Sequence, residues 1–270
     1  MTGPDPERVA RFRALHEAGI FVIANAWDAG SARTLAGLGF PAIATSSGAM
    51  ANTMGRLDGR VSREEALAHA RSLVEAVAVP VSADLENGFG DSPEDAAGTI
   101  RRGAELGLAG GSIEDYSGKA LYDLTHAVER IQAAVEAARA APGGFVLTAR
   151  AENFIRGRPD LEDTIRRLQA YERAGADVLF APGLPDLEAV RAVCRALSRP
   201  FNFMVGIPGK SWPLAELQAA GVRRVSLATS LYKAAMTGVV AAAREIREKG
   251  TFGFVDSGLP SKELAGYMRP

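Results

Sequence analysis

The sequence has very few of the residues that build disulfide frameworks or histidine-based metal sites. Cys194 is the single cysteine among 270 residues, so the chain cannot form an internal disulfide, and the helical pattern around Cys194 predicts a packing role. His16, His69 and His126 are the three histidines, and all fall in or near predicted helices. Their placement away from strand ends argues against a Ser-His-Asp triad and against a histidine-rich zinc site.

An excess of one charge and long apolar runs are also missing. A net formal charge of -1 leaves no surplus of Lys and Arg to neutralise a phosphate backbone, so we expect no nucleic-acid partner. Residues 1–7 lack a basic region followed by an apolar core, and no apolar run approaches the ~20 residues that a membrane span needs. We therefore expect a cytoplasmic protein with a small-molecule partner and no membrane partner.

Short apolar, β-branched runs alternate with amphipathic segments along the whole chain. The composition, 47% hydrophobic and 23% charged, suits a globular protein with a sizeable core. The segment 66–77 carries apolar residues at the three- and four-residue spacing of one helix face. Eight runs predict strands: 21–27, 42–47, 79–85, 111–114, 145–151, 177–181, 201–205 and 222–228.

Capping residues stand where this alternation needs helices to begin and end. Ser62 with Glu65 forms a capping-box pattern, Ser92 precedes Pro93, and glycines stand before the strands that follow. The further N-caps are Asp160 and Asp186, and the glycines are Gly39, Gly107, Gly175 and Gly221.

The strands are nearly continuous in their apolar character, which is typical of a parallel sheet covered on both faces. Eight such units predict an α/β fold, a single (β/α)8 barrel over residues 1–270, with residues 250–270 a C-terminal tail that contains a helix at 261–267. A doubly wound open sheet is the alternative, but no strand is followed by the Gly-x-Gly-x-x-Gly turn of dinucleotide-binding folds.

Acidic residues follow the third and fourth predicted strands, where barrels carry their reactive groups. Asp84 and Glu86 lie two residues apart, so on an extended segment their side chains share one face, and Glu114 ends the neighbouring strand. Converging carboxylates repel one another unless a cation compensates them. We predict that Asp84, Glu86 and Glu114 hold Mg²⁺. The alternative is that these acids cap helices or pair with Arg101, Arg102 and Arg150.

Three other strand ends carry candidate substrate-binding residues. Arg150 presents a planar fork suited to a carboxylate, and Glu152 either contacts the substrate or pairs with Arg150. At Ser46, Ser47 and Gly48, a glycine lets backbone amides approach an anion and hydroxyls add donors. The predicted substrate-binding set is completed by Asp84, by Trp27 at the end of the first strand and by Asn202 in the seventh.

From Asn25 to about Ser230, the sequence resembles the isocitrate lyase/phosphoenolpyruvate mutase superfamily, most strongly its short bacterial branch. The segments that carry the resemblance are Asn-Ala-Trp-Asp at 25–28, Ser-Ser-Gly at 46–48, Gly-Arg-Leu-Asp-Gly at 55–59, Asp-Leu-Glu-Asn-Gly-Phe-Gly at 84–90, Ser-Ile-Glu-Asp at 112–115 and Thr-Ala-Arg-Ala-Glu-Asn at 148–153. The resemblance implies an enzyme that uses Mg²⁺, or Mn²⁺ in its place, and acts on 2-oxo acids or their relatives through an enolpyruvate-like species.

The resemblance also implies roles for individual residues. Asp84, Glu86 and Glu114 match the family's metal-binding acids, and Asp58 matches an acid that contacts the metal shell or the reacting group. The segment 46–48 matches the one that holds the pyruvate-like carboxylate, with Arg150 as its cationic partner. We assign catalytic roles to Asp58, Glu114 and Arg150. Relatives form dimers or tetramers and exchange a C-terminal helix, so we expect a homo-oligomer that uses the tail 250–270.

One departure from the family's lyases matters. They carry a Lys-Lys-Cys-Gly-His segment after the fourth strand, whose cysteine is the general acid, whereas residues 116–124 here read Tyr-Ser-Gly-Lys-Ala-Leu-Tyr-Asp-Leu. Cleavage of isocitrate or methylisocitrate by that mechanism is therefore not expected. Tyr116, Lys119 and Tyr122 are candidate replacements for the acid.

The leading hypothesis is a carbon-carbon lyase or decarboxylase acting on a small dicarboxylate of the oxaloacetate or substituted-malate type. The alternatives are a phosphoenolpyruvate mutase-like or carboxyphosphonoenolpyruvate mutase-like phosphoryl transferase, and a barrel that binds a metabolite without turning it over.

Overall fold

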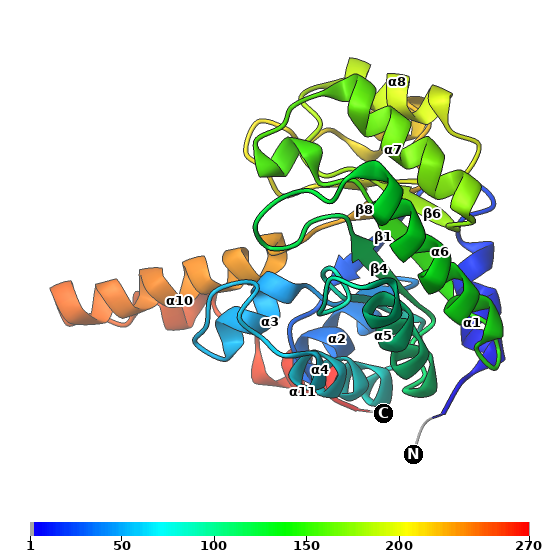
Figure 1. Ribbon diagram of the computed structural model, residues 1–270. Helices are drawn as coiled ribbons and strands as arrows, with labels where there is room; N and C mark the ends of the chain where they lie inside the picture. Colours follow the sequence, from blue (N-terminus) through cyan, green and yellow to red (C-terminus); the bar gives the residue numbers. More distant parts are fainter. Residues whose placement is uncertain (1–2, 270) are drawn as a thin grey trace.

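The protein forms a closed barrel of parallel strands surrounded by helices (Figure 1). The structure is a computed structural model that describes residues 3–269. Each strand pairs in parallel with its neighbours in chain order, and β8 pairs with β1. The strands are β1 (Phe21–Asn25), β2 (Ile43–Ala44), β3 (Val81–Asp84), β4 (Gly110–Glu114), β5 (Val146–Arg150), β6 (Val178–Phe180), β7 (Phe201–Met204) and β8 (Arg224–Ser226). The predicted (β/α)8 barrel is confirmed, and the open sheet is excluded.

Several strands are shorter than predicted, because residues at the carboxyl ends leave the sheet to build the loops above it. After β2, for example, Ser46 already caps a helix that begins at Ser47. The helices are α1 (Pro6–Ala14), α2 (Ala29–Gly37), α3 (Ser47–Thr53), α4 (Arg63–Ala76), α5 (Pro93–Glu105), α6 (Leu124–Ala140), α7 (Leu161–Ala174), α8 (Leu187–Ala196), α9 (Leu214–Ala219), α10 (Ser230–Lys249) and α11 (Ser261–Tyr267), with 3-10 turns η1 (Asn153–Arg156) and η2 (Gly253–Ser257).

The predicted helix boundaries are confirmed at the caps. Ser62 and Ser92 each form a complete capping box, and Pro93 stands at the first turn of α5. Asp160 and Asp186 cap α7 and α8, and the four predicted glycines have positive φ. His16 is a small correction, because α1 ends at Ala14 and the His16 ring lies beyond it, edge-on to two phenylalanines.

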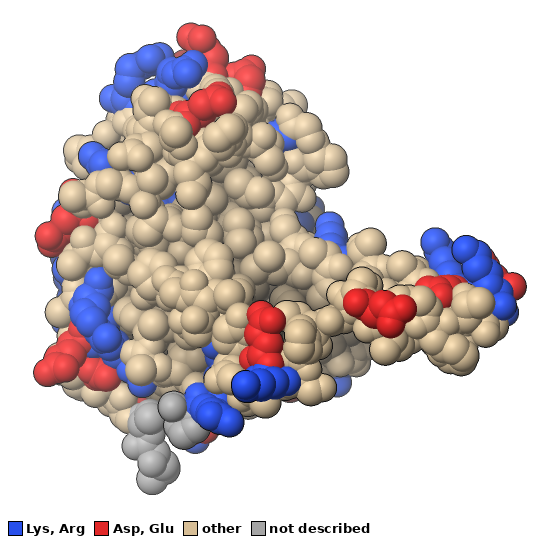
Figure 2. All heavy atoms as spheres, turned by 180° about the vertical axis from the view of Figure 1, so that it is seen from behind, with Lys and Arg blue, Asp and Glu red and all other residues tan. Residues whose placement is uncertain are grey.

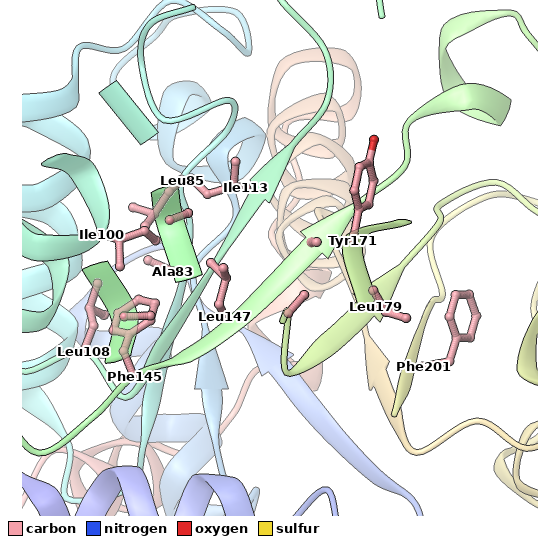
Figure 3. Close-up of a cluster of buried hydrophobic side chains, with 14 of the residues drawn as sticks. Ala83, Leu85, Ile100, Leu108, Ile113, Phe145, Leu147, Tyr171, Leu179 and Phe201 are labelled. Atoms are coloured by element: carbon pink, nitrogen blue, oxygen red, sulfur yellow. The ribbon is translucent and has the colours of Figure 1, made fainter. Parts of the chain in front are cut away.

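Two apolar clusters hold the barrel together. One lies between the strands and the surrounding helices, where Leu85, Ile100, Leu108 and Phe145 interlock (Figure 3). The other fills the amino-terminal end of the barrel, where Phe12 of α1 joins residues of four strands. Because α1 closes that end, the opposite end, where the strands' carboxyl termini meet, is free for a functional site.

Helix α10 departs from the ring of helices and projects away from the barrel (Figure 1), and none of its residues is buried. Charged side chains gather toward its far end, while uncharged atoms cover much of its length (Figure 2). The chain then returns, and α11 packs against α2, where Arg33 donates to the carbonyl of Met268 at 2.6 Å. The predicted helix at 261–267 is confirmed, but the projecting segment begins well before residue 250.

No helix within residues 3–269 combines the length and the hydropathy needed to cross a bilayer.

The closure by α1 predicts a stability effect. Phe12 has no exposed surface and stacks edge-on against Phe21, so Phe12→Ala should lower the free energy of unfolding by about 3–5 kcal/mol in urea titrations. Leu38→Ala, at a side chain that is 58% exposed, is the matched control and should change it by less than about 0.5 kcal/mol. Equal effects of the two substitutions would contradict the claim that the packing of α1 over the barrel end stabilises the fold.

Candidate functional site

A cavity of about 1130 Å³ opens at the carboxyl ends of the strands. Its walls come from the strands β1 to β8 and from the loops that follow β2, β3, β4 and β5. Most of the predicted site residues line it, namely Asp58, Asp84, Glu86, Glu114, Arg150, Asn202, Ser46, Ser47 and Gly48. The rule that places function at this end of a barrel therefore located the cavity from the sequence.

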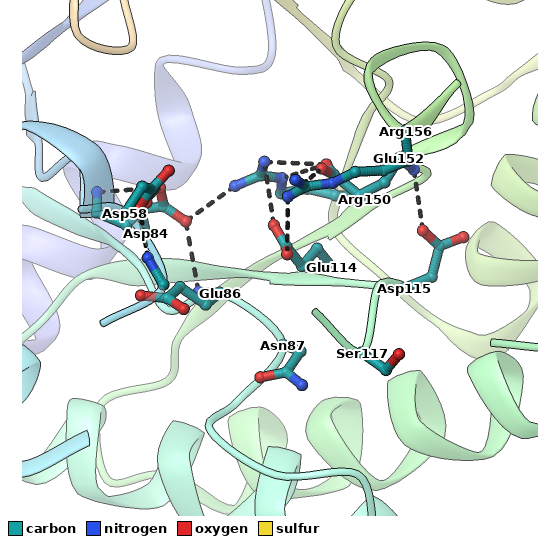
Figure 4. A network of polar contacts seen from close by, with 12 residues as sticks. Asp58, Asp84, Glu86, Asn87, Glu114, Asp115, Ser117, Arg150, Glu152 and Arg156 are labelled. Atoms are coloured by element: carbon teal, nitrogen blue, oxygen red, sulfur yellow. Dashed lines mark hydrogen bonds and ion pairs between the residues drawn. The ribbon is translucent and has the colours of Figure 1, made fainter. Parts of the chain in front are cut away.

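Arg150, at the end of β5, is the centre of the polar network (Figure 4). Its guanidinium lies 2.9 Å from Asp84 Oδ1, 3.2 Å from Glu114 Oε2 and 2.9 Å from Glu152 Oε1. Burial by itself would lower the pKa of Arg150, but the charges of Glu152, Asp84 and Glu114 outweigh it and raise that pKa. The predicted convergence of acids is therefore present for Asp84 and Glu114, and the cation between them here is an arginine.

Glu152 does not face the cavity, because it is fully buried behind Arg150. Burial raises its pKa, while Arg150 and Arg156 oppose that shift. Of the two roles considered for Glu152, the structure supports the ion pair with Arg150 rather than contact with a substrate. Its backbone N–H donates to Asp115, so the whole strand end is fixed from behind.

Glu86 reaches the cavity by a different route from the one predicted. Strand β3 ends at Asp84, and Glu86 has a left-handed backbone with φ of 49°, so the two acids do not lie on one extended face. Burial, followed by the charges of Asp84 and Asp58, raises the pKa of Glu86 to about 7. Its Oε1 is buried and has no hydrogen-bond partner among residues 3–269.

Asp84 is held by the segment that follows β2. The backbone N–H and the hydroxyl of Ser47 both donate to Asp84 Oδ2, at 3.2 and 2.9 Å, while Ser46 caps α3. A Cβ atom at Gly48 would lie 3.3 Å from Asp58 Oδ2, so a glycine there keeps Asp58 close to this segment. Part of the predicted anion-binding capacity of Ser47 is thus already directed at Asp84.

Glu114 is almost completely buried, and burial together with Glu152 raises its pKa well above the ordinary value, although Arg150 acts in the opposite direction. Arg156, which the sequence analysis missed, also contacts it, with Nη2 3.4 Å from Glu114 Oε1 and 3.3 Å from Glu152 Oε2. The Arg156 guanidinium stacks 4.0 Å from the centre of the Tyr116 ring. The four-residue spacing from Glu152 to Arg156 was the available signal.

Trp27 is a correction to the predicted substrate-binding set. It is absent from the described residues that line the cavity, and its ring packs edge-on against Tyr232 of α10 at 5.6 Å. The chain turns outward after β1, because Asp28 caps α2, and this carries the indole away from the barrel mouth.

The floor of the cavity contains a second arginine that was not predicted. Arg224 of β8 is buried, and its hydrogen-bond partners within residues 3–269 are the Asn202 amide oxygen at 2.8 Å, the Thr148 hydroxyl at 3.0 Å and His16 at 3.4 Å. Burial lowers the pKa of Arg224 to about 9. Asn202 therefore lines the floor as predicted, and its amide also donates to Ser226.

Two of the three candidate replacements for the lyase cysteine line the cavity. Tyr116 and Lys119 do so, whereas the Tyr122 hydroxyl donates to Asp91 at 2.5 Å and accepts from Asn87. Burial, with the hydrogen bond to Asp91, raises the pKa of Tyr122 to about 12. Tyr122 is therefore placed to fix loops rather than to donate a proton to a substrate.

The acidic side chains alone do not enclose an ion. Within residues 3–269, no three His, Cys, Asp or Glu side chains come close enough together to form a metal cage. Because Mg²⁺ keeps several waters and takes few protein ligands, this spacing is compatible with a site that works partly through water.

Comparisons with known proteins agree with this geometry. The sequence profile of the phosphoenolpyruvate phosphomutase family matches residues 12–247. An uncharacterized protein of Mycobacterium tuberculosis is 34% identical over 240 residues, covering 88% of this chain and 89% of that protein. A 2-methylisocitrate lyase of Aeropyrum pernix is 30% identical over 226 residues, covering 79% and 71%.

Solved structures extend the similarity to the whole barrel. A putative lyase/mutase of Burkholderia cenocepacia is 48% identical, with a TM-score of 0.96 over 98% of this chain and 96% of that one. An oxaloacetate acetylhydrolase with its product oxalate is 25% identical, with a TM-score of 0.88 over 99% and 95%. The chain therefore belongs to the phosphoenolpyruvate phosphomutase family, within the isocitrate lyase/phosphoenolpyruvate mutase superfamily of lyases and mutases.

Proposed function

We propose that this chain is a cytoplasmic, Mg²⁺-dependent carbon-carbon lyase or decarboxylase for a small 2-oxo or 2-hydroxy dicarboxylate of the oxaloacetate or substituted-malate type. One juxtaposition carries the proposal. At the mouth of a single cavity, Arg150 offers a fork for a carboxylate, and Glu86 offers a buried oxygen that lacks a partner among the described residues. A substrate anion and a divalent cation would complete these two groups together.

The donor set fits a hard divalent ion. Asp84, Glu86 and Glu114 supply carboxylate oxygens, with Asp58 close by across Gly48. When bound, Mg²⁺ supplies stabilisation of the negative charge that develops on a 2-oxo group as a neighbouring carbon-carbon bond breaks. Mn²⁺ has the same preference for oxygen ligands and is the alternative ion.

The protein's own residues provide the remaining steps. Arg150 binds the substrate carboxylate and is kept in place by Glu152, while Ser46, Ser47 and Gly48 shape the wall beside it. From a 2-oxo dicarboxylate, CO2 leaves and the electron pair of the broken bond remains on the pyruvate fragment as its enolate. From a 2-hydroxy dicarboxylate, a base removes the hydroxyl proton as the 2-oxo group of pyruvate forms, and the electron pair leaves with the other carboxylate fragment. In either case a proton is then added to the carbon that held the broken bond. Tyr116 and Lys119 line the cavity and are the candidate donors for that proton.

A phosphoenolpyruvate mutase-like transfer is the second candidate, and one observation favours it. Besides Arg150, the cavity wall includes Arg60, Arg63, Lys119 and Arg156, which together offer more cationic groups for a phosphonate than the sequence analysis counted. The third candidate is a barrel that binds a metabolite without turning it over, and activity assays distinguish it from the two enzymes.

The first test measures, with Mg²⁺, pyruvate release from oxaloacetate and alkylated malates, and conversion of phosphonopyruvate to phosphoenolpyruvate by phosphorus NMR. We expect one carboxylated substrate to be cleaved, and both Asp84→Ala and Arg150→Ala to lower kcat/KM by at least about 100-fold, since each removes a charged group at the reacting centre. Arg71→Ala, at an exposed position on α4, is the control and should keep full activity.

Conversion of phosphonopyruvate to phosphoenolpyruvate, with no cleavage of the carboxylated compounds, would move the assignment to the mutase. No turnover of any compound, with Mg²⁺ and oxalate binding seen by calorimetry, would contradict the lyase and favour the binding role.

A second proposal concerns assembly. Met236, Val239 and Val240 lie exposed on the uncharged stretch of α10, and a projecting apolar helix needs a cover. We infer that a second copy of the chain covers α10, and that the segment after residue 250 is exchanged or shared in a dimer or tetramer.

Light scattering on the eluting full-length protein should give a dimer or tetramer. Val239→Asp with Val240→Asp should shift it toward monomer, because charges at an apolar contact are costly to bury. A chain ending at Gly250 should lose the assembly as well. Thr237→Ser on the same helix is the control, and an unchanged mass for the aspartate variant would contradict the covered helix.

A third test uses the raised pKa of Glu86. A carboxyl group with a folded-state pKa of about 7, against an ordinary 4.5, stabilises the fold at low pH and loses that contribution as pH rises through 7. In metal-free protein, Glu86→Gln should therefore raise Tm by a few degrees at pH 8 and by much less at pH 5, measured by differential scanning calorimetry; about 1 kcal/mol corresponds to about 2–4 °C.

Glu105→Gln, at an exposed acid on α5, is the matched control and should shift Tm little at either pH. With saturating Mg²⁺ at pH 8, the wild type should have a higher Tm than Glu86→Gln, because the wild type gains stability from binding the cation. A Glu86→Gln effect that is equal at both pH values would contradict the assignment.

A further inference from the structure

The turn that carries Glu86 has an unusual backbone. Between β3 and α5, Glu86 and Phe89 have φ values of 49° and 61°, and Gly88 between them has 85°. Residues other than glycine rarely adopt positive φ values, so an isolated peptide of this sequence would not keep this backbone conformation by itself. Something outside the turn must fix it.

Arg130 of α6 grips the turn from behind. Its Nη1 donates to the carbonyls of Gly90 and Ser92, both at 2.9 Å, and its Nη2 donates to the carbonyl of Asn87. Its side chain is 1% exposed. Among residues 3–269 it forms no ion pair with a carboxylate, and its hydrogen bonds go to backbone carbonyls of this turn.

Two further side chains contact carbonyls of the turn. The Thr99 hydroxyl of α5 donates to Gly88 at 2.7 Å, and His126 Nε2 of α6 lies 2.8 Å from the Asp91 carbonyl. The turn is therefore bound along its length to the two helices beneath it, which pack closely on each other.

Tyr122 links the same turn to the loop that follows β4. Its hydroxyl donates to the Asp91 carboxylate and accepts from the Asn87 amide, and the Arg130 guanidinium lies 4.6 Å from the centre of its ring. That loop also carries Tyr116 and Lys119 at the cavity wall. Arg130 thus stands at the junction of two segments that line the cavity.

Core packing alone does not account for an arginine here. A buried guanidinium is costly, and an apolar residue of similar volume would fill the space without that cost. Burial indeed lowers the pKa of Arg130. The arginine is explained by its forked donors, which reach three carbonyls that no apolar side chain could satisfy.

We propose that Arg130 is a positioning residue, which holds residues 86–92 in the shape that directs the Glu86 carboxylate at a divalent cation. This inference rests on the metal use proposed above. Arg130 itself touches neither substrate nor cation; it acts through the backbone of the turn.

The test compares Arg130→Met, Arg130→Lys and Tyr122→Phe in the full-length protein. Arg139→Met, the same change at an exposed arginine near the end of α6, is the matched control. Hydrogen-deuterium exchange without metal should show amides of residues 86–92 exchanging at least about 10-fold faster in Arg130→Met, with Arg130→Lys and Tyr122→Phe in between. Titration calorimetry should show Mn²⁺ binding at least about 10-fold weaker in Arg130→Met and unchanged in Arg139→Met.

If the amide exchange rates of residues 86–92 are unchanged in Arg130→Met, Arg130 does not hold this turn and the proposal is wrong. Faster exchange with unchanged Mn²⁺ affinity would overturn its role toward the cation. If wild-type protein binds no Mn²⁺, both the proposed metal use and the role of Arg130 toward the cation are wrong. The exchange data still show separately whether Arg130 holds residues 86–92. Should Arg130→Met fail to fold, Arg130→Lys and Tyr122→Phe decide by the same two measurements.

Discussion

The placement of one guanidinium among three carboxyl groups is the interaction on which the rest of the site depends. Arg150 joins the ends of β3, β4 and β5 through Asp84, Glu114 and Glu152, and it is itself largely withdrawn from water. Removing it would leave Asp84 without its cationic partner, and Glu114 and Glu152 with Arg156 alone, which costs more than the net value of the ion pairs. The ion pairs of Arg150 therefore help to hold the ends of β3, β4 and β5 at their spacing.

The barrel supports this cluster with a second, fully buried one. Asp115 follows Glu114 directly and accepts from the Tyr171 hydroxyl at 2.6 Å, from Arg167 at 3.0 Å and from the Glu152 backbone at 2.9 Å. Burial raises the pKa of Asp115, but those donors oppose the shift. Helix α7 is thereby tied to β4 and β5 behind the cavity, so the strand-end residues Glu114 and Arg150 rest on rigid elements.

The sequence was sufficient wherever a residue's place at the cavity follows from its position along a strand. The rule that reactive groups follow barrel strands found Asp84, Glu114 and Arg150, and cap chemistry fixed the helix starts. It also placed Glu86 at the cavity, but the expected extended face shared with Asp84 was wrong, because Glu86 has a left-handed backbone; Trp27 does not line the cavity and packs against Tyr232 instead. Arg130 and Arg224 were missed because their partners are distant in sequence or face the barrel interior, whereas the spacing of Arg156 from Glu152 was a local signal that could have been used. Periodicity reports which side of an element is buried, not which polar groups meet there.

The proposed cation bears on the local charge balance of the site. Five carboxyl groups, those of Asp58, Asp84, Glu86, Glu114 and Glu152, stand near Arg150 and Arg156, and Arg60, Arg63 and Lys119 also line the cavity wall; a substrate dicarboxylate would add negative charge to the local excess around Arg150. Raised carboxyl pKa values relieve part of it, but a neutral Glu86 could not attract an ion. A divalent cation that enters with the substrate would offset both charges at once, so cation and substrate should favour each other's binding. The arrangement therefore suits a site in which the cation and the substrate each strengthen the binding of the other.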